Sequence, residues 1–126
     1  VYAVFERQTE IALANLARCY EAVGDRVSVV YMTGTDFGMQ TGPFLSPDTY
    51  RRLYQPFHKA LNDWIHAHTP WKVFMHTCGS VIDLIPDFIE AGFDVLNPVA
   101  DTDAPGSKVA STSDQYRGRR VRWTFA

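Results

Sequence analysis

Residues 71–99 carry the clearest architectural signal in this chain; they read WKVFMHTCGSVIDLIPDFIEAGFDVLNPV. An apolar run over 71–77 is followed by a turn, an amphipathic segment over 81–91 and a second apolar run over 93–99. Two short strands joined through one helix are typical of a βαβ unit, in which the strands lie parallel. We therefore predict adjacent parallel strands over 71–77 and 93–99, with a helix over 81–91 that Ser80 caps.

The same alternation of helix and strand precedes this stretch. Residues 5–23 place apolar side chains at helical spacing and Gly24 follows as a stop signal, so we predict a helix there. The short β-branched run over 27–32 predicts a strand that is buried on both faces. Near the other end of the chain, residues 120–125 form a candidate fourth strand after a loop-like segment over 101–114.

A second helix is predicted after a glycine-rich loop over 34–45. Ser46-Pro47-Asp48 supplies an N-cap, a proline at the first helical position and an acid in the first turn. This helix should run to about His68 and kink at Pro56, where the ring removes a backbone donor. Its buried stripe is expected to consist of Tyr50, Leu53, Phe57, Leu61, Trp64 and Ile65. Its three histidines, His58, His66 and His68, are expected on or near the exposed side, without a functional role.

The composition excludes several classes of protein. The chain has 126 residues, of which 46% are hydrophobic and 21% are charged, and its formal net charge is −2. No apolar run reaches the ~18 residues of a membrane span, and the near-neutral charge favours neither nucleic acid nor a membrane surface as partner. Two cysteines do not make a disulfide framework. We therefore expect a cytoplasmic globular protein.

Strands that alternate with helices indicate an α/β fold, either an open doubly wound sheet or a closed (β/α)8 barrel. No GxGxxG motif follows a strand, so nothing favours a dinucleotide-binding sheet. A barrel needs ~250 residues, so this chain would supply three or four of its eight strands. The chain opens Val1-Tyr2-Ala3-Val4, without Met and without the features of a targeting segment. We expect residues 1–126 to be the central fragment of a single TIM barrel from a longer enzyme.

Candidate site residues stand where the predicted strands end, because ligands of both α/β architectures bind at the carboxyl ends of strands. Asp36 follows the first strand, His76 and Cys78 end the second, and Asn97 ends the third. Asp36 is an oxygen ligand or a proton-transfer carboxylate, or else a turn residue that bonds its own backbone. Asn97 either bonds a substrate or satisfies the end of its strand.

His76 and Cys78 are the pair that most directly indicates chemistry. Residues i and i+2 of a strand face the same side, so the imidazole and the thiol can point into one site. Zinc takes such nitrogen and sulfur ligands and promotes ionisation of a bound thiol. Two ligands do not hold a zinc ion, however, and Cys19 lies on the first predicted helix. The pair is also compatible with a small buried thiol beside a hydrogen-bonded histidine.

Six segments of the chain form an ordered set of motifs. They are Asp36-Phe37-Gly38-Met39-Gln40, Gly42-Pro43-Phe44-Leu45-Ser46-Pro47, Tyr54-Gln55-Pro56-Phe57, Lys72-Val73-Phe74-Met75-His76-Thr77-Cys78-Gly79-Ser80, Leu84-Ile85-Pro86-Asp87-Phe88-Ile89-Glu90-Ala91-Gly92 and Asp94-Val95-Leu96-Asn97-Pro98-Val99. Together they resemble the uroporphyrinogen decarboxylase superfamily over roughly residues 8–99. This superfamily contains the haem-pathway decarboxylase and zinc-dependent methyltransferases that move methyl groups between corrinoid proteins and thiols. Its members are (β/α)8 barrels of well over twice this length.

The two branches of this superfamily imply different sites. In the methyltransferase branch, His76-x-Cys78 matches the zinc motif, and the family's further Cys would lie beyond the end of this chain. The decarboxylase uses no metal and binds the carboxylates of its substrate through Arg and Asp, so the resemblance places Asp36 near the pyrroles. Phe37 replaces the Ser or Thr that is usual in the decarboxylase. Residues 101–126 lack the Met-Asp-Pro-like segment of the family and are expected to be a divergent tail.

Three functions are consistent with this sequence. The first is zinc-dependent methyl transfer between a corrinoid and a thiol, with Asp36 as catalytic residue, His76 and Cys78 as metal ligands and Asn97 as substrate-binding residue. The alternative is decarboxylation of uroporphyrinogen in haem and porphyrin biosynthesis, by a carboxy-lyase that binds a tetrapyrrole. The third is a catalytically silent fragment that packs against another chain. Half a barrel leaves sheet edges and an apolar face open, so we expect the isolated fragment to self-associate and to be inactive.

Overall fold

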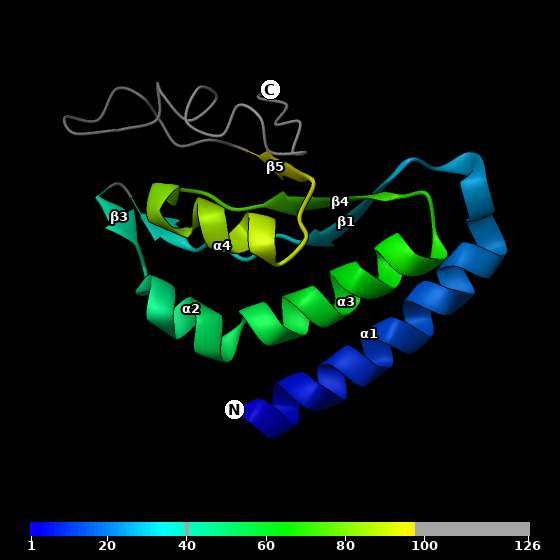
Figure 1. The fold of residues 1–126 in the computed structure, drawn as a ribbon, viewed down its shortest axis with the longest axis horizontal. Helices are drawn as coiled ribbons and strands as arrows, with labels where there is room; N and C mark the ends of the chain where they lie inside the picture. The colour runs from blue at the N-terminus through cyan, green and yellow to red at the C-terminus, as the bar shows by residue number, and fades with distance from the viewer. Residues whose placement is uncertain (40, 98–126) are drawn as a thin grey trace.

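The computed structural model describes residues 1–39 and 41–97, whose main sheet has three parallel strands with helices against one face (Figure 1). Two 3₁₀ turns and a small antiparallel hairpin complete the described part. Along the chain the elements are α1 (Tyr2–Val23), η1 (Gly24–Arg26), β1 (Val29–Thr33), β2 (Gly38–Met39), β3 (Gly42–Pro43), α2 (Pro47–Leu53), α3 (Gln55–His68), β4 (Lys72–His76), η2 (Ile82–Leu84), α4 (Ile85–Glu90) and β5 (Val95–Asn97).

The order of the strands confirms the predicted parallel arrangement. The sheet runs β1-β4-β5, and both neighbouring pairs are parallel. Val30 pairs with Val73, and Met75 pairs with Leu96. The connection from β1 to β4 contains α3, and the connection from β4 to β5 contains α4. Both connections move in the same direction across the sheet. Because such crossover connections share one handedness, α3 and α4 lie on the same face of the sheet. The described residues therefore belong to the α/β class, and the carboxyl ends of all three strands lie at one edge.

The two faces of the sheet differ in burial. Val73, Met75 and Leu96 point into the core and are at most 1% exposed. On the opposite face, Val29 and Tyr31 of β1 are 49% and 58% exposed. The prediction that the first strand is buried on both faces is therefore wrong. The physical reason is that the helices of the described residues cover only one side of the sheet (Figure 1).

The long helix predicted over 46–68 forms as two helices, α2 and α3. Ser46 caps α2 as predicted, because its hydroxyl accepts a hydrogen bond from the backbone N–H of Thr49 at 3.2 Å. Helix α2 ends at Leu53, Tyr54 separates it from α3, and α3 starts at Gln55 with Pro56 in its first turn. A proline is tolerated there because the N–H it lacks would have no partner within the helix. The predicted kink is thus an interruption at Tyr54, whose backbone still makes helical hydrogen bonds to Tyr50 and from His58.

The helix predicted over 81–91 is shorter than expected and begins differently. The 3₁₀ turn η2 precedes α4, which carries Pro86 in its first turn. The side chain of Ser80 does not cap this helix. The backbone N–H of Ser80 donates a hydrogen bond to the carbonyl oxygen of Met39 at 2.8 Å, so Ser80 belongs to the contact with β2. The helix begins next to Pro86 because proline is favoured in a first turn and disfavoured further inside.

Several predicted features lie outside the described residues. These are the candidate strand over 120–125, the loop-like segment over 101–114, the divergent tail over 101–126 and positions 98–99 of the third strand. Among the helices of residues 1–39 and 41–97, none combines the length and the apolar character that crossing a membrane requires.

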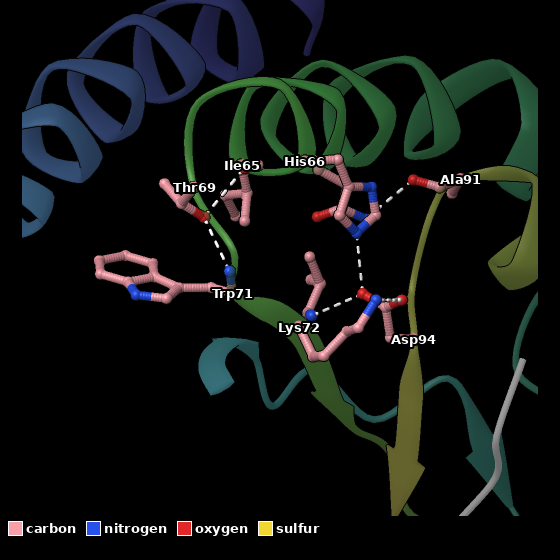
Figure 2. A network of polar contacts seen from close by, with 9 residues as sticks. Ile65, His66, Thr69, Trp71, Lys72, Ala91 and Asp94 are labelled. Carbon is pink, nitrogen blue, oxygen red and sulfur yellow. Dashed lines mark hydrogen bonds and ion pairs between the residues drawn. The ribbon is translucent and has the colours of Figure 1, made fainter. Parts of the chain in front are cut away.

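The carboxylate of Asp94 holds together the amino end of the sheet (Figure 2). It accepts hydrogen bonds at 2.8 Å from the backbone N–H of Val73 and from Nε2 of His66, and Nζ of Lys72 lies 3.4 Å away. Burial would raise the pKa of Asp94, but the Val73 N–H, His66 and Lys72 outweigh burial, and the pKa is lowered. An ionised carboxylate therefore joins α3, β4 and the approach to β5.

Asp94→Asn should lower the free energy of unfolding by about 1–2 kcal/mol at neutral pH, because asparagine has no charge and offers one acceptor oxygen where the carboxylate offers two. A lowered pKa means that this stabilisation is fully present above the ordinary Asp pKa of about 3.9 and disappears as the pH falls through the folded pKa. The difference between the two proteins should therefore shrink toward about pH 3. Thermal unfolding of both proteins, monitored by circular dichroism between neutral pH and about pH 3, measures this difference in stability.

Asp63→Asn is the matched control for this substitution. Asp63 pairs with Lys59 one helical turn away at 2.8 Å, but both side chains are at least half exposed. Such surface pairs contribute less than about 1 kcal/mol, so this variant should lose little stability at any pH. Equal losses in the two variants would contradict a special role for Asp94.

Candidate metal site

Three side chains that can bind a metal ion converge at the carboxyl end of the sheet. One ligand atom from each of Asp36, His76 and Cys78 lies within 4.8 Å of the other two. The Sγ of Cys78 is 3.3 Å from Nε2 of His76, and Oδ1 of Asp36 is 4.0 Å from the same nitrogen. An oxygen, a nitrogen and a sulfur atom therefore surround one small volume.

Two neighbouring strands position these side chains. His76 is the last residue of β4, and Cys78 follows two residues later. Asp36 follows β1, which ends at Thr33 and pairs with β4 in parallel. The exits of parallel neighbours meet at the same edge of a sheet. A hydrogen bond of 2.8 Å from the backbone N–H of Cys78 to Oδ1 of Asp36 joins the two exits directly.

The loop after β1 is bound to the loop after β4. The backbone N–H of Phe37 donates to Oγ1 of Thr77 at 2.7 Å, and both residues are buried. Met39 and Ser80 form an antiparallel bridge, which attaches the hairpin β2–β3 to the second loop. The predicted loop over 34–45 therefore contains regular structure that the sequence pattern did not reveal.

Two glycines permit this close approach. A Cβ atom on Gly79 would lie 2.2 Å from the carbonyl carbon of Gly38, and a Cβ atom on Gly38 would lie 2.7 Å from that of Gly79. Gly79 also has a φ of 80°, a conformation that L side chains rarely adopt. A side chain at either position would push the loops apart and would move Asp36 away from Cys78.

The electrostatics of the site favour a neutral thiol in the absence of a cation. Asp36 and Cys78 are exposed, and His76 is half-buried. Desolvation of the thiol, followed by the negative charge of Asp36, raises the pKa of Cys78. Cysteines that act as free nucleophiles have a lowered pKa instead. A cation among the three ligand atoms would favour the ionised thiol.

Asn97 lies at the site edge of the sheet, whereas Cys19 does not. Asn97 ends β5, and its backbone is in register with His76 on the neighbouring strand. Cys19 precedes Tyr20, whose ring packs against Trp71 with the centroids 5.3 Å apart. Since Trp71 lies just before β4, Cys19 is near the opposite end of the sheet.

The expectation that His58 lies on the exposed side of its helix is wrong. Its ring centroid lies 5.3 Å from that of Phe93, and its Nδ1 is 2.9 Å from the hydroxyl of Tyr50. Burial lowers the pKa of His58 to about 4, so the imidazole is neutral at neutral pH. The spacing of Tyr50, Tyr54 and His58 by four residues is the sequence signal for this inward position.

Comparison of the chain with protein-family models, with curated proteins and with solved structures found no significant match. The resemblance to the uroporphyrinogen decarboxylase superfamily therefore depends on the sequence motifs. The chemistry of the site depends on the geometry of Asp36, His76 and Cys78.

Thr77→Val should lower the free energy of unfolding by about 1–3 kcal/mol, because the buried N–H of Phe37 loses its acceptor. Thr77→Ser keeps the hydroxyl and should lose clearly less, although it removes a methyl group. Denaturant unfolding of both variants measures the difference. Equal stability of the valine and serine variants would show that this hydrogen bond does not hold the two loops together.

Proposed function

We propose that this chain is part of a (β/α)8-barrel enzyme in which Asp36, His76 and Cys78 hold a zinc ion for methyl transfer between a corrinoid and a thiol. The observation that carries this proposal is the convergence of three ligand atoms within 4.8 Å at the carboxyl end of a parallel sheet. The resemblance of the sequence motifs to zinc-dependent methyltransferases supports the same reaction.

The spacing of the ligand atoms fits zinc. Zinc binds sulfur, nitrogen and oxygen ligands at ~2.0–2.3 Å, so tetrahedral neighbours lie about 3.3–3.8 Å apart. The Cys78 sulfur and the Asp36 oxygen are 3.3 Å and 4.0 Å from the His76 nitrogen. Small side-chain rotations would bring all three atoms to bonding distance.

In this proposal Asp36 takes the place of the further Cys that the resemblance implies, so that three protein ligands hold the ion, which is the number expected for a catalytic site. Catalytic zinc sites keep a fourth position open for water or substrate, whereas structural sites use four protein ligands. Bound there, zinc would supply a Lewis acid that favours ionisation of the substrate thiol. His76 and Cys78 would hold the ion, and Asp36 would complete the set while its hydrogen bond to the Cys78 N–H orients the loop. Asn97, at the same edge, is proposed to contact the substrate.

Within residues 1–39 and 41–97, the sheet face without helices and the two end strands, β1 and β5, support the barrel part of the proposal. In a closed barrel, the face that carries Val29 and Tyr31 would form the interior, and β1 and β5 would pair with further strands. Active sites of such barrels lie at the carboxyl ends of the strands, which is where Asp36, His76 and Cys78 gather.

Zinc binding by the full chain tests the proposal. Equilibrium dialysis should find about one zinc per chain. Cys78→Ser should weaken binding at least about 100-fold, because a hydroxyl stays protonated where a thiol ionises on the metal. Cys19→Ser removes the other exposed thiol of the described residues and should leave zinc binding unchanged. Cobalt(II) substitution should give a sulfur-to-cobalt charge-transfer band that disappears only in Cys78→Ser.

Two further outcomes separate the alternatives. Asp36→Asn should weaken zinc binding while the sulfur-to-cobalt band persists, since Cys78 still binds. A wild-type chain that binds zinc no more tightly than Cys78→Ser would contradict the proposal. That result would leave the metal-free decarboxylase or a catalytically silent fragment that packs against another chain.

A further inference from the structure

A cavity of about 220 Å³ lies between α1, α3 and the end of β1, on the helix-covered side of the sheet. We call it the α1–α3 pocket. Among its lining residues are Phe5, Ala12, Met32, Thr35, Phe57 and His58. Gln8 and Thr35, which are exposed, mark its solvent side. The proposed zinc chemistry does not use this pocket.

Aromatic rings form much of the wall of the pocket. The ring of Phe5 lies 5.3 Å from that of Tyr54 and 5.2 Å from that of Phe57, measured between centroids. The rings of Phe93 and His58 are 5.3 Å apart. Rings that hold one another in place leave a preformed, largely apolar cavity, which is the usual character of a small-molecule site.

The pocket carries no charge that could pair with an ionic ligand. None of its lining residues is Asp, Glu, Lys or Arg. His58 is neutral at neutral pH, because burial lowers its pKa to about 4. A charged molecule would lose its hydration without gaining a partner. The pocket therefore favours uncharged ligands.

One hydroxyl at the pocket, that of Thr35, has no acceptor among the described residues. The hydroxyl of Thr33 donates to Oγ1 of Thr35 at 3.1 Å, and the backbone N–H of Thr35 donates to Oγ1 of Thr33 at 3.2 Å. In the part of the chain that the structure describes, the hydroxyl proton of Thr35 itself has no acceptor. An oxygen atom on a ligand can accept it.

We propose that the α1–α3 pocket binds a small, uncharged, monocyclic aromatic molecule whose oxygen accepts a hydrogen bond from Thr35. A cavity of about 150 Å³ accommodates benzene. The larger volume of about 220 Å³ leaves room for one ring with a small substituent. This proposal does not depend on the zinc site, and phenol is its simplest probe.

Methyl NMR of the three methionines locates the binding of phenol. Met32 lines the pocket, Met39 is exposed on β2, and Met75 is buried in the core. Titration of the full chain with phenol should shift the Met32 methyl resonance to saturation and should leave Met39 unchanged. A Met32 resonance that does not saturate, or equal shifts at Met39, would overturn the proposal.

Matched variants test the volume and the hydrogen bond separately. Ala12→Phe fills the pocket and should weaken phenol binding at least about tenfold, whereas Ala14→Phe, at an exposed position of α1, should not change it. Thr35→Val should weaken phenol binding about tenfold and leave toluene binding unchanged, because only phenol offers an oxygen. Benzoate should bind at least about tenfold more weakly than phenol.

The opposite results overturn the proposal. Equal phenol affinity in Ala12→Phe and Ala14→Phe would show that phenol binds elsewhere. Unchanged phenol affinity in Thr35→Val would remove the Thr35 contact and with it the oxygen requirement. Circular dichroism of each variant establishes that it is folded, and Thr35→Val, at an exposed position, provides a test even if Ala12→Phe unfolds.

Discussion

The backbones of Gly38 and Gly79 are in direct contact, and a Cβ atom added to Gly79 would lie 2.2 Å from the carbonyl carbon of Gly38. This contact, together with the buried hydrogen bond from Phe37 to Thr77, keeps the loops after β1 and β4 against each other. Because of that contact, the carboxylate of Asp36 reaches the backbone N–H of Cys78. The candidate metal site therefore depends on two residues that have no side chain.

The two ends of the sheet have different roles. At the amino end, Asp94 accepts a hydrogen bond from the backbone N–H of Val73 in β4 and pairs with His66 and Lys72. The polar groups at this end therefore bond one another and stabilise the fold. At the carboxyl end, Asp36 and Cys78 are exposed and their ligand atoms face a common volume. This division agrees with the general pattern of α/β folds, in which stability resides at one end and chemistry at the other.

Phe37 connects the candidate metal site to the helices. It is 1% exposed, and its ring centroid lies 5.1 Å from that of Tyr54 and 5.5 Å from that of Tyr50. Tyr54 in turn lines the α1–α3 pocket. The residue directly after Asp36 is therefore anchored in an aromatic cluster, of which Tyr54 and His58 also line the pocket. Phe37 therefore packs between the candidate metal site and the α1–α3 pocket.

Local patterns in the sequence determined the three parallel strands, the helix over 5–23, the Ser46 cap and the pairing of His76 with Cys78, because periodicity and capping act over a few residues. Tertiary structure alone decided the exposed face of β1 and the direct hydrogen bond between the backbone N–H of Cys78 and Asp36. Asp36 and Cys78 are 42 residues apart, and they meet only because β1 and β4 are neighbours whose following loops lack side chains at the contact. Contacts between such distant residues depend on how whole elements pack, which no short pattern encodes.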